Sequence, residues 1–360
     1  MTEAPVPEAS IEVRDEDAFD VPAMAEWLRA NAVDPSGLEG VPAVRQFTGG
    51  VSNLTYLLRY PTRDLILRRP PAGTKAKGAH DVLREHGLQQ ALAPAFPQVP
   101  TMVACCADEA VIGTDFYVMD RVVGTILRSD LPPALGLDEA GVRDLCDAAI
   151  DTLVALHDVD LAATGLAGYD RGPDYVRRQV EGWSARYRKA HTEDVGDYEA
   201  VMGWLAERQP VDRPHVLVHN DFRFDNLVLA PEDPTRIVAV LDWELATVGD
   251  PLMDLGSSLA YWVQADDDAT FQAFRRQPTN APGMRTRWGF VERYAQLRGL
   301  AVTSEEWAFY EVFGLFRLAV IAQQIHYRYF HGQTTNPAFA IMKPAVLALE
   351  QRCRRLAGLT

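Results

Sequence analysis

Cysteine is scarce in this sequence of 360 residues, and its spacing matches no metal-binding pattern. The four thiols are typical of buried cysteines in a reducing compartment; they are Cys105, Cys106, Cys146 and Cys353. Residues 1–20 are acidic and contain proline, but they lack the apolar core of a signal peptide. We therefore expect a flexible acidic tail over residues 1–20 and a cytoplasmic protein.

Long apolar runs and an excess of positive charge are also missing. No stretch of about 18 apolar residues occurs, so no membrane span is expected. The net charge of −15 argues against nucleic acid, whose phosphates need a basic surface. A nucleotide is not excluded, because a few cations and a metal act locally within a Debye length of about 8 Å. The acidic surface would instead steer a cationic acceptor toward the protein.

The first third of the chain has the pattern of an antiparallel sheet with one main helix. Apolar residues alternate through short runs that predict strands over residues 43–47, 53–60, 65–68, 102–107 and 116–120. A short helix is expected over residues 21–31, and the main helix over residues 81–92 carries Val82, Leu88 and Leu92 at mainly helical spacing. A length of 360 residues suggests two domains.

Helical spacing dominates after residue 137. Leu145, Ala149, Leu153 and Leu156 line one helix face, and residues 176–187 form another amphipathic pattern. Residues 305–330 are apolar nearly all round, which predicts a central buried helix. The sequence therefore predicts an α+β chain with a smaller sheet lobe followed by a larger, mostly helical lobe.

A polar stretch between apolar runs carries the chemistry. Residues 227–229 and 237–241 flank a Pro/Asp turn and predict a hairpin. The open end of an antiparallel hairpin brings Asn226 and Asp242 together, beside Asp221. One amide oxygen and one carboxylate suit Mg²⁺, which keeps waters and phosphates as its remaining ligands. The alternative is an ordinary polar loop beside a solvated hairpin.

The motif His219-x-Asp221-x-x-x-x-Asn226, followed by Asp242, resembles the catalytic loop and metal-binding acid of the protein-kinase-like superfamily. The wording HNDFRFDN…LDWELATVGDPLMDLG is more narrowly similar to the aminoglycoside phosphotransferase family. Within it, the chain resembles the branch associated with acyl-CoA dehydrogenases, from about residue 47 to the end. The family usually has Gly where this chain has Asn220.

The resemblance implies a protein-kinase-like bilobal fold, with a nucleotide-binding lobe at 21–122 and a catalytic lobe at 123–360. Asp221 would orient the acceptor hydroxyl and take its proton, while Arg223 would neutralise charge on the transferred phosphoryl group. Asn226 and Asp242 would hold Mg²⁺. Three structural residues complete the loop, and they are His219 as a packed orienting residue, Asp250 as a helix cap before Pro251, and Asp254 as a brace.

The phosphate-binding residues are expected in the first lobe. Gly49, Gly50 and Ser52 lie between two predicted strands, where glycines let the backbone approach a phosphate; a simple hairpin turn would look the same. By resemblance, Arg68 replaces the usual kinase Lys and Glu85 is its ion-pair partner. Arg69 competes with Arg68 for this assignment.

The adenine-binding segment is expected where the two lobes join. By resemblance, backbone groups of Asp120 to Val122 would bind adenine, and Met119 would line its pocket. A plain strand ending in a turn at Gly124 predicts the same sequence.

These expectations describe a phosphotransferase that uses ATP or GTP with Mg²⁺ and a small-molecule hydroxyl acceptor. The resemblance points to a hydroxyacyl-CoA acceptor and a functional link to an acyl-CoA dehydrogenase, while the wider family allows aminoglycosides, choline-like alcohols or amino sugars. A nucleotide-binding module without catalysis and a metal-dependent hydrolase are the alternatives. The sequence leaves open the acceptor-binding residues and the oligomeric state.

Overall fold

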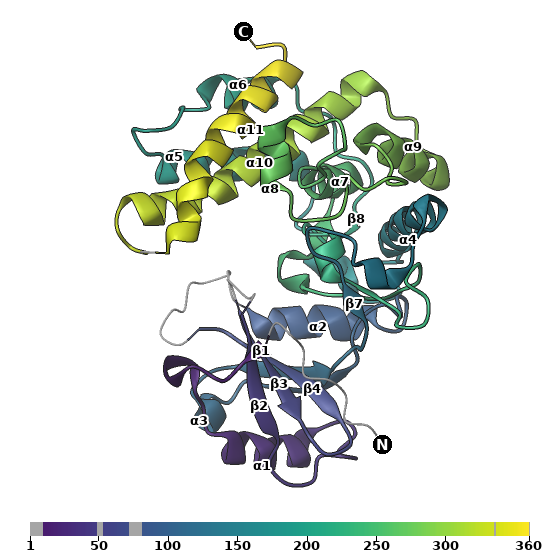
Figure 1. Ribbon diagram of the computed structural model, residues 1–360, viewed down its shortest axis with the longest axis vertical. Coiled ribbons are helices and arrows are strands. Elements are labelled where there is room, and N and C mark those ends of the chain that lie inside the picture. The colour runs from purple at the N-terminus through teal and green to yellow at the C-terminus, as the bar shows by residue number, and fades with distance from the viewer. Residues whose placement is uncertain (1–9, 49–52, 72–80, 335, 360) are drawn as a thin grey trace. The chain divides into compact units, whose positions relative to one another are not determined.

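The computed structural model describes residues 10–48, 53–71, 81–334 and 336–359, which fall into two compact units (Figure 1). The first unit ends at Val123 and also includes Leu241–Glu244, and the second contains Gly124–Val240 and Leu245–Thr360. The expected boundary between residues 122 and 123 is one residue from the observed one. Leu241–Glu244 had been expected in the second lobe, and their grouping with the first unit corrects that expectation.

A six-stranded antiparallel sheet in the order β1-β2-β3-β4-β6-β5 forms the first unit. Its strands are β1 (Ser10–Ile11), β2 (Ala43–Phe47), β3 (Leu54–Arg59), β4 (Asp64–Arg69), β5 (Met102–Cys106) and β6 (Phe116–Asp120), and its helices are α1 (Val21–Asn31), α2 (Val82–Leu92) and α3 (Glu109–Ile112). The expected strands β2 to β6 and the expected helices over residues 21–31 and 81–92 are confirmed.

Residues 10–20 pack against the first unit, and Ser10–Ile11 form the edge strand of its sheet, so the expected tail is wrong for this part of residues 1–20. Ser10 of β1 pairs with Phe47 of β2, which extends the sheet at its edge. The carbonyl of Asp17 accepts a hydrogen bond from the Tyr56 hydroxyl at 2.8 Å. Acidic composition suggested a solvated tail, but Glu12 pairs with Arg45 at 2.5 Å. Residues 1–9 lie outside the described part of the chain.

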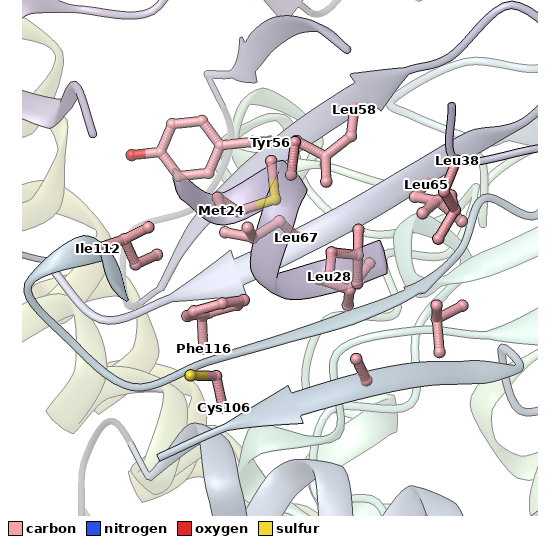
Figure 2. Packing of buried hydrophobic residues seen from close by; sticks show 14 of the residues in the cluster. Met24, Leu28, Leu38, Tyr56, Leu58, Leu65, Leu67, Cys106, Ile112 and Phe116 are labelled. Atoms are coloured by element: carbon pink, nitrogen blue, oxygen red, sulfur yellow. The ribbon is translucent and has the colours of Figure 1, made fainter. Parts of the chain in front are cut away.

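The strands of the first unit send alternate side chains to opposite faces, and each face has its own apolar cluster. Leu65 and Leu67 of β4 join the cluster under α1, where they pack with Met24 and Leu28 (Figure 2). Ile66, between them, joins the cluster on the face that α2 covers (Figure 1). A strand that is buried on both faces reads as a continuous apolar run, which explains why Leu65–Ile66–Leu67 does not alternate with polar residues.

The second unit is mostly helical. Its helices are α4 (Glu139–His157), α5 (Tyr175–Ala190), α6 (Glu199–Glu207), α7 (Pro251–Leu259), α8 (Ala269–Phe274), α9 (Arg287–Arg298), α10 (Ser304–Phe330) and α11 (Met342–Leu356). Its strands are β7 (Thr125–Ile126), β8 (Val216–Val218), β9 (Leu227–Leu229), β10 (Ile237–Val240) and β11 (Thr247–Gly249). The predicted β9–β10 hairpin is confirmed, with Leu227 opposite Val240, and β7 pairs with the other edge of β9.

Helix α10 is the central helix of this unit and packs against α5, α7 and α11. Gly256 of α7 and Gly314 of α10 face one another so closely that a Cβ on either would clash with backbone of the opposing helix. Within the described residues, α10 is also the helix with the length and apolar composition of a membrane span, and 67% of that stretch is buried by its neighbours. The sequence predicted a buried central helix over residues 305–330, and the observed burial of α10 agrees with that prediction.

Candidate active site

The polar loop that follows β8 is held in place by hydrogen bonds to a buried carboxylate. Asp254 accepts a hydrogen bond from the backbone N–H of His219 at 2.8 Å and another from the N–H of Asn220 at 2.7 Å. The oxygen that accepts the His219 N–H, Oδ2, also lies 3.1 Å from His157 Nε2, and His157 Nδ1 lies 2.7 Å from the Tyr294 hydroxyl. The bracing contact implied for Asp254 is therefore present.

The start of α7 explains how Asp254 reaches this position. Asp250 caps the helix by accepting the backbone N–H groups of Leu252 and Met253, and Pro251 takes the first helical position. Asp254 follows one turn later and is fully buried. Burial pushes the pKa of Asp254 upward, but hydrogen bonds from His157 and from the His219 backbone outweigh it and hold the pKa below its usual value.

Asn220 adopts a backbone conformation that most residues avoid. Its φ of 64° lies in the left-handed region, where Gly, Asn and Asp are tolerated best. Its side-chain Nδ2 donates to the carbonyl of Leu245 at 3.1 Å. This geometry gives a physical reason for the Gly that the family usually has here, and Asn keeps the loop without it.

The carboxylate of Asp221 is held from two sides. Asn226 Nδ2 donates to Asp221 Oδ2 at 2.9 Å and to its carbonyl at 2.8 Å, while Arg223 Nε lies 3.1 Å from Oδ1. The backbone N–H of Asp221 donates to His219 Nδ1 at 3.2 Å, which supports His219 as a packed orienting residue. The side chain of Asp221 keeps 15% exposure, so an acceptor can reach it.

Two residues that the sequence analysis missed fix Arg223. Asp225 Oδ2 lies 3.2 Å from its Nη2, and the Tyr261 ring lies under its guanidinium, with the Arg223 Cζ 4.3 Å from the ring centroid. Burial raises the pKa of Asp225, and the charge of Arg223 opposes this rise. Asp225 stood in the motif itself, whereas no sequence signal links Tyr261 to it.

In the first unit, Arg68 of β4 contacts several carboxylates. Its Nη1 lies 2.8 Å from Glu85 Oε1, and its Nη2 lies 3.0 Å from Asp242 Oδ1 and 3.8 Å from Glu244 Oε2. Glu85 of α2 is almost fully buried, and this burial raises its pKa although Arg68 opposes the rise. The expected Arg68–Glu85 pair is present.

The competing assignment of Arg69 is resolved by strand alternation. Arg69 points to the opposite face of the sheet, where its Nη2 donates to the Tyr56 hydroxyl at 2.9 Å and its guanidinium lies over the Phe19 ring. Arg69 is thus part of the α1-side core, and Arg68 is the cation on the α2 side.

Asp242 also has a strained backbone, with a φ of 68°. Positive φ at a non-glycine residue is often retained for function. One carboxylate oxygen of Asp242 pairs with Arg68, and the other makes no hydrogen bond to a described residue. In the second unit, Asn226 uses its Nδ2 for Asp221, which leaves its oxygen without a hydrogen bond in the described part of the chain. A carboxylate oxygen and an amide oxygen are each of the ligand type that Mg²⁺ takes.

The structure gives a few contacts for the segment that is expected to bind adenine. Met119 is buried among Leu57, Ile66 and Tyr117 on the α2 side of the sheet. The Asp120 side chain pairs with Arg63 at 2.8 Å, and its backbone N–H donates to the carbonyl of Thr101. The backbone N–H of Val122 has no hydrogen bond to a described residue. Gly49, Gly50 and Ser52 lie outside the described residues.

Comparison with known proteins shows the family of this chain. A model described as the phosphotransferase enzyme family matches residues 43–290. The chain belongs to this family. It is 37% identical over 81% of its length to acyl-CoA dehydrogenase family member 10 from Mus musculus, and it spans 27% of that relative's length. The resemblance to the acyl-CoA-dehydrogenase-associated branch is thus confirmed.

Solved structures agree with this phosphotransferase assignment. A Ralstonia eutropha JMP134 protein assigned to the aminoglycoside phosphotransferases has a TM-score of 0.79 and 31% identity, covering 95% of this chain and 99% of that one. A thermostable mutant of APH(4)-Ia, solved with AMP-PNP and hygromycin B, shares the fold at a TM-score of 0.55 and 14% identity, covering 94% of this chain and 98% of that one. The expected protein-kinase-like α+β fold is confirmed, and the family to which the chain belongs is one of phosphotransferase enzymes.

Proposed function

We propose that this phosphotransferase transfers the γ-phosphoryl group of ATP or GTP to the hydroxyl of a hydroxyacyl-CoA or a related hydroxylated metabolite, with Mg²⁺. The observation that carries the reaction is the hold on the Asp221 carboxylate by Asn226 and Arg223, at 2.9 and 3.1 Å. A carboxylate fixed in this way and still open to solvent is placed to orient an alcohol and accept its proton.

The remaining residues divide the electrostatic work of phosphoryl transfer. Arg223 carries a charge beside Asp221 and would neutralise the transferring phosphoryl group. Arg68 would grip phosphate oxygens with the guanidinium edge that now faces Asp242, while Glu85 keeps it oriented. Asn226 and Asp242 would hold the metal, which when bound supplies charge neutralisation at the β- and γ-phosphates.

The backbone of the Asp120 to Val122 segment would bind the nucleotide base, with Met119 against it and the Gly49, Gly50 and Ser52 loop at the phosphates. A nucleotide donor is supported by the AMP-PNP complex of the more distant APH(4)-Ia structure. The acyl-CoA acceptor is supported by the name of the relative from Mus musculus, in which a region like this chain is part of a larger acyl-CoA dehydrogenase family member.

The test is an acceptor screen with purified protein, ATP or GTP, and Mg²⁺. We expect ADP or GDP release that depends on the acceptor, and a mass gain of one phosphate on a hydroxyacyl-CoA. A mass gain on choline or an aminoglycoside instead would select the alternative acceptor class. Nucleotide binding without turnover on any acceptor in the panel would instead identify a module that has lost catalysis. Omission of Mg²⁺ should abolish transfer.

A further inference from the structure

Arg317, in the middle of α10, is a buried cation without a carboxylate partner among the described residues. Only 4% of the residue is exposed, and none of the ion pairs or side-chain hydrogen bonds within the described chain includes it. A buried charge without a counter-ion is costly, and buried arginines are normally paired. An arginine in this state is suited to bind an anionic ligand.

The aromatic ring of Trp183 packs against the guanidinium of Arg317. Its Cζ lies 5.1 Å from the centroid of the Trp183 ring on α5. Its charge also acts on Tyr261, the residue whose ring lies under Arg223. The charge of Arg317 thus reaches the ring that packs on Arg223. Arg317 lies in the same unit as the loop that carries Asp221.

The line of positive charge continues past Trp183 to the surface. Arg186 lies over the same ring, with its Cζ 4.7 Å from the ring centroid. Arg186 also lines a groove of about 330 Å³ between α5 and α10, together with Lys189 and Arg328. These three exposed cations have no ion-pair partner in the described part of the chain, although the protein has a net charge of −15. Carboxylates are plentiful elsewhere and are absent from this groove lining.

We propose that the acceptor is an anionic alcohol whose acidic group, a carboxylate or a phosphate, is bound by Arg317, and that the groove of Arg186, Lys189 and Arg328 binds its further phosphates. The proposal rests on the proposed transfer to a hydroxyl at Asp221 and adds the charge class of the acceptor. It reverses the expectation that an acidic surface favours a cationic acceptor. A guanidinium that packs on Trp183 and is only 4% exposed binds an anion more strongly than a fully exposed one does.

Cationic acceptors are disfavoured by the same geometry. An aminoglycoside or a choline-like alcohol would place its ammonium groups beside the buried charge of Arg317, where like charges repel with little solvent screening. A short hydroxycarboxylic acid would use Arg317 alone. A hydroxyacyl thioester of coenzyme A is long and multiply phosphorylated, and it would use Arg317 together with the groove.

The first test measures binding without catalysis. Protein saturated with Mg²⁺ and AMP-PNP is titrated calorimetrically with coenzyme A, so that the adenine site is already filled. We expect binding that weakens as salt is raised, and a loss of about tenfold in affinity for Arg186→Gln on the exposed rim. Arg188→Gln is the matched control, because Arg188 lies on the same helix but pairs with Glu199 at 2.7 Å. Equal affinities in the two variants, or no binding by the unmodified protein, would overturn the groove assignment.

The second test uses phosphate transfer to 3-hydroxybutyrate, 3-hydroxybutyryl-CoA, choline and hygromycin B. Arg317→Gln should lower the rate of transfer to both anionic acceptors at least tenfold. Arg317→Lys should recover part of that rate. Arg186→Gln should lower the rate of transfer to 3-hydroxybutyryl-CoA only. Transfer to choline or hygromycin B alone would reject the anionic class and leave the proposed reaction intact. Coenzyme A binding as predicted without transfer to any acceptor would instead reject the reaction and support the site. If Arg317→Gln unfolds, the exposed Arg186 variant still decides.

Discussion

Asp254 holds the backbone of His219, whose N–H donates to the Asp254 carboxylate at 2.8 Å. The same carboxylate accepts the next N–H of the loop and contacts the ring of His157. A fully buried carboxylate with this many donors is stabilised as the ion. The loop that carries Asp221 is therefore fixed by one side chain from another helix, and its geometry depends on the charge of that side chain.

Asp254→Asn should destabilise the protein by about 2–4 kcal/mol, because an amide donor replaces an ionised acceptor opposite two backbone N–H groups. The lowered pKa of Asp254 sets the pH dependence: the contribution is complete above the unfolded-state pKa and is lost as the pH falls through the lower folded-state pKa. The free energy of unfolding in urea should thus differ between the two proteins above about pH 5, with the difference shrinking below about pH 4. The exposed Glu207→Gln is the control, and a difference that grows in acid would contradict the prediction.

Asp221→Ala should lower turnover by roughly 10² to 10⁴, which is about 3 to 5 kcal/mol in the barrier. The loss comes from removing the group that orients the alcohol and accepts its proton. The affinity for ATP should change little, because no contact in the described part of the chain joins Asp221 to Arg68, Met119 or Asp120, which are expected to bind the nucleotide. The exposed Glu232→Gln, in the turn after β9, serves as the control for handling. Turnover within a factor of ten of the unmodified protein would remove Asp221 as the base.

Asp242→Ala should remove the dependence of nucleotide affinity on Mg²⁺. Asp242 is also a partner of Arg68, so its loss frees that guanidinium and should leave metal-free ATP binding equal or tighter. Calorimetric titration with ATP, in the presence of Mg²⁺ and then of EDTA, measures both effects. A Mg²⁺ response equal to that of the unmodified protein would take Asp242 out of the metal site.

The Arg68–Glu85 pair should behave as a buried ion pair. Arg68→Met leaves Glu85 buried without its partner and should cost about 3–5 kcal/mol of unfolding free energy. The double variant Arg68→Met with Glu85→Gln should recover most of this loss, because neither side then buries a lone charge. Urea denaturation of both variants at neutral pH checks this. Additive losses would show that the two side chains are energetically independent.

Local patterns made the fold predictable. The strands β2 to β6 and the β9–β10 hairpin follow from apolar runs and turn residues, because these signals lie within a few positions of one another. The contacts that finish the site join residues far apart in the chain: His157 reaches Asp254 across 97 positions, and Arg68 reaches Asp242 across 174. No periodicity encodes such pairs, and only the family resemblance indicated Glu85 as a partner of Arg68.

Composition misled the prediction at the N-terminus, and net charge is a weak guide to the acceptor. The acidic residues near the N-terminus suggested a solvated tail, yet Ser10 and Ile11 form the edge strand β1 because a neighbouring strand and Arg45 offer partners. The net charge suggested a cationic acceptor, whereas Arg317 and the groove cations gather on two helices whose positions a total charge cannot reveal. At both places the local arrangement of charged residues matters, and the net charge of the chain carries no information about that arrangement.

Ala usually destabilises a protein less than Gly does, and the left-handed backbone of Asn220 predicts the opposite order at this position. At a φ of 64°, Ala should destabilise the protein by roughly 1–2 kcal/mol and Gly by less, since Gly has no Cβ to clash with the carbonyl. Asn280 provides the matched control, because it is not among the residues with positive φ in the described chain. There Gly should be the more damaging substitution, through the entropy of the unfolded chain. Asn220→Gly should also keep turnover within a few-fold, while Asn220→Val should displace Asp221 and lose at least tenfold. Melting temperatures and initial rates for the four Ala and Gly variants decide, and the same order of Ala and Gly at both positions would refute the role of the backbone at Asn220.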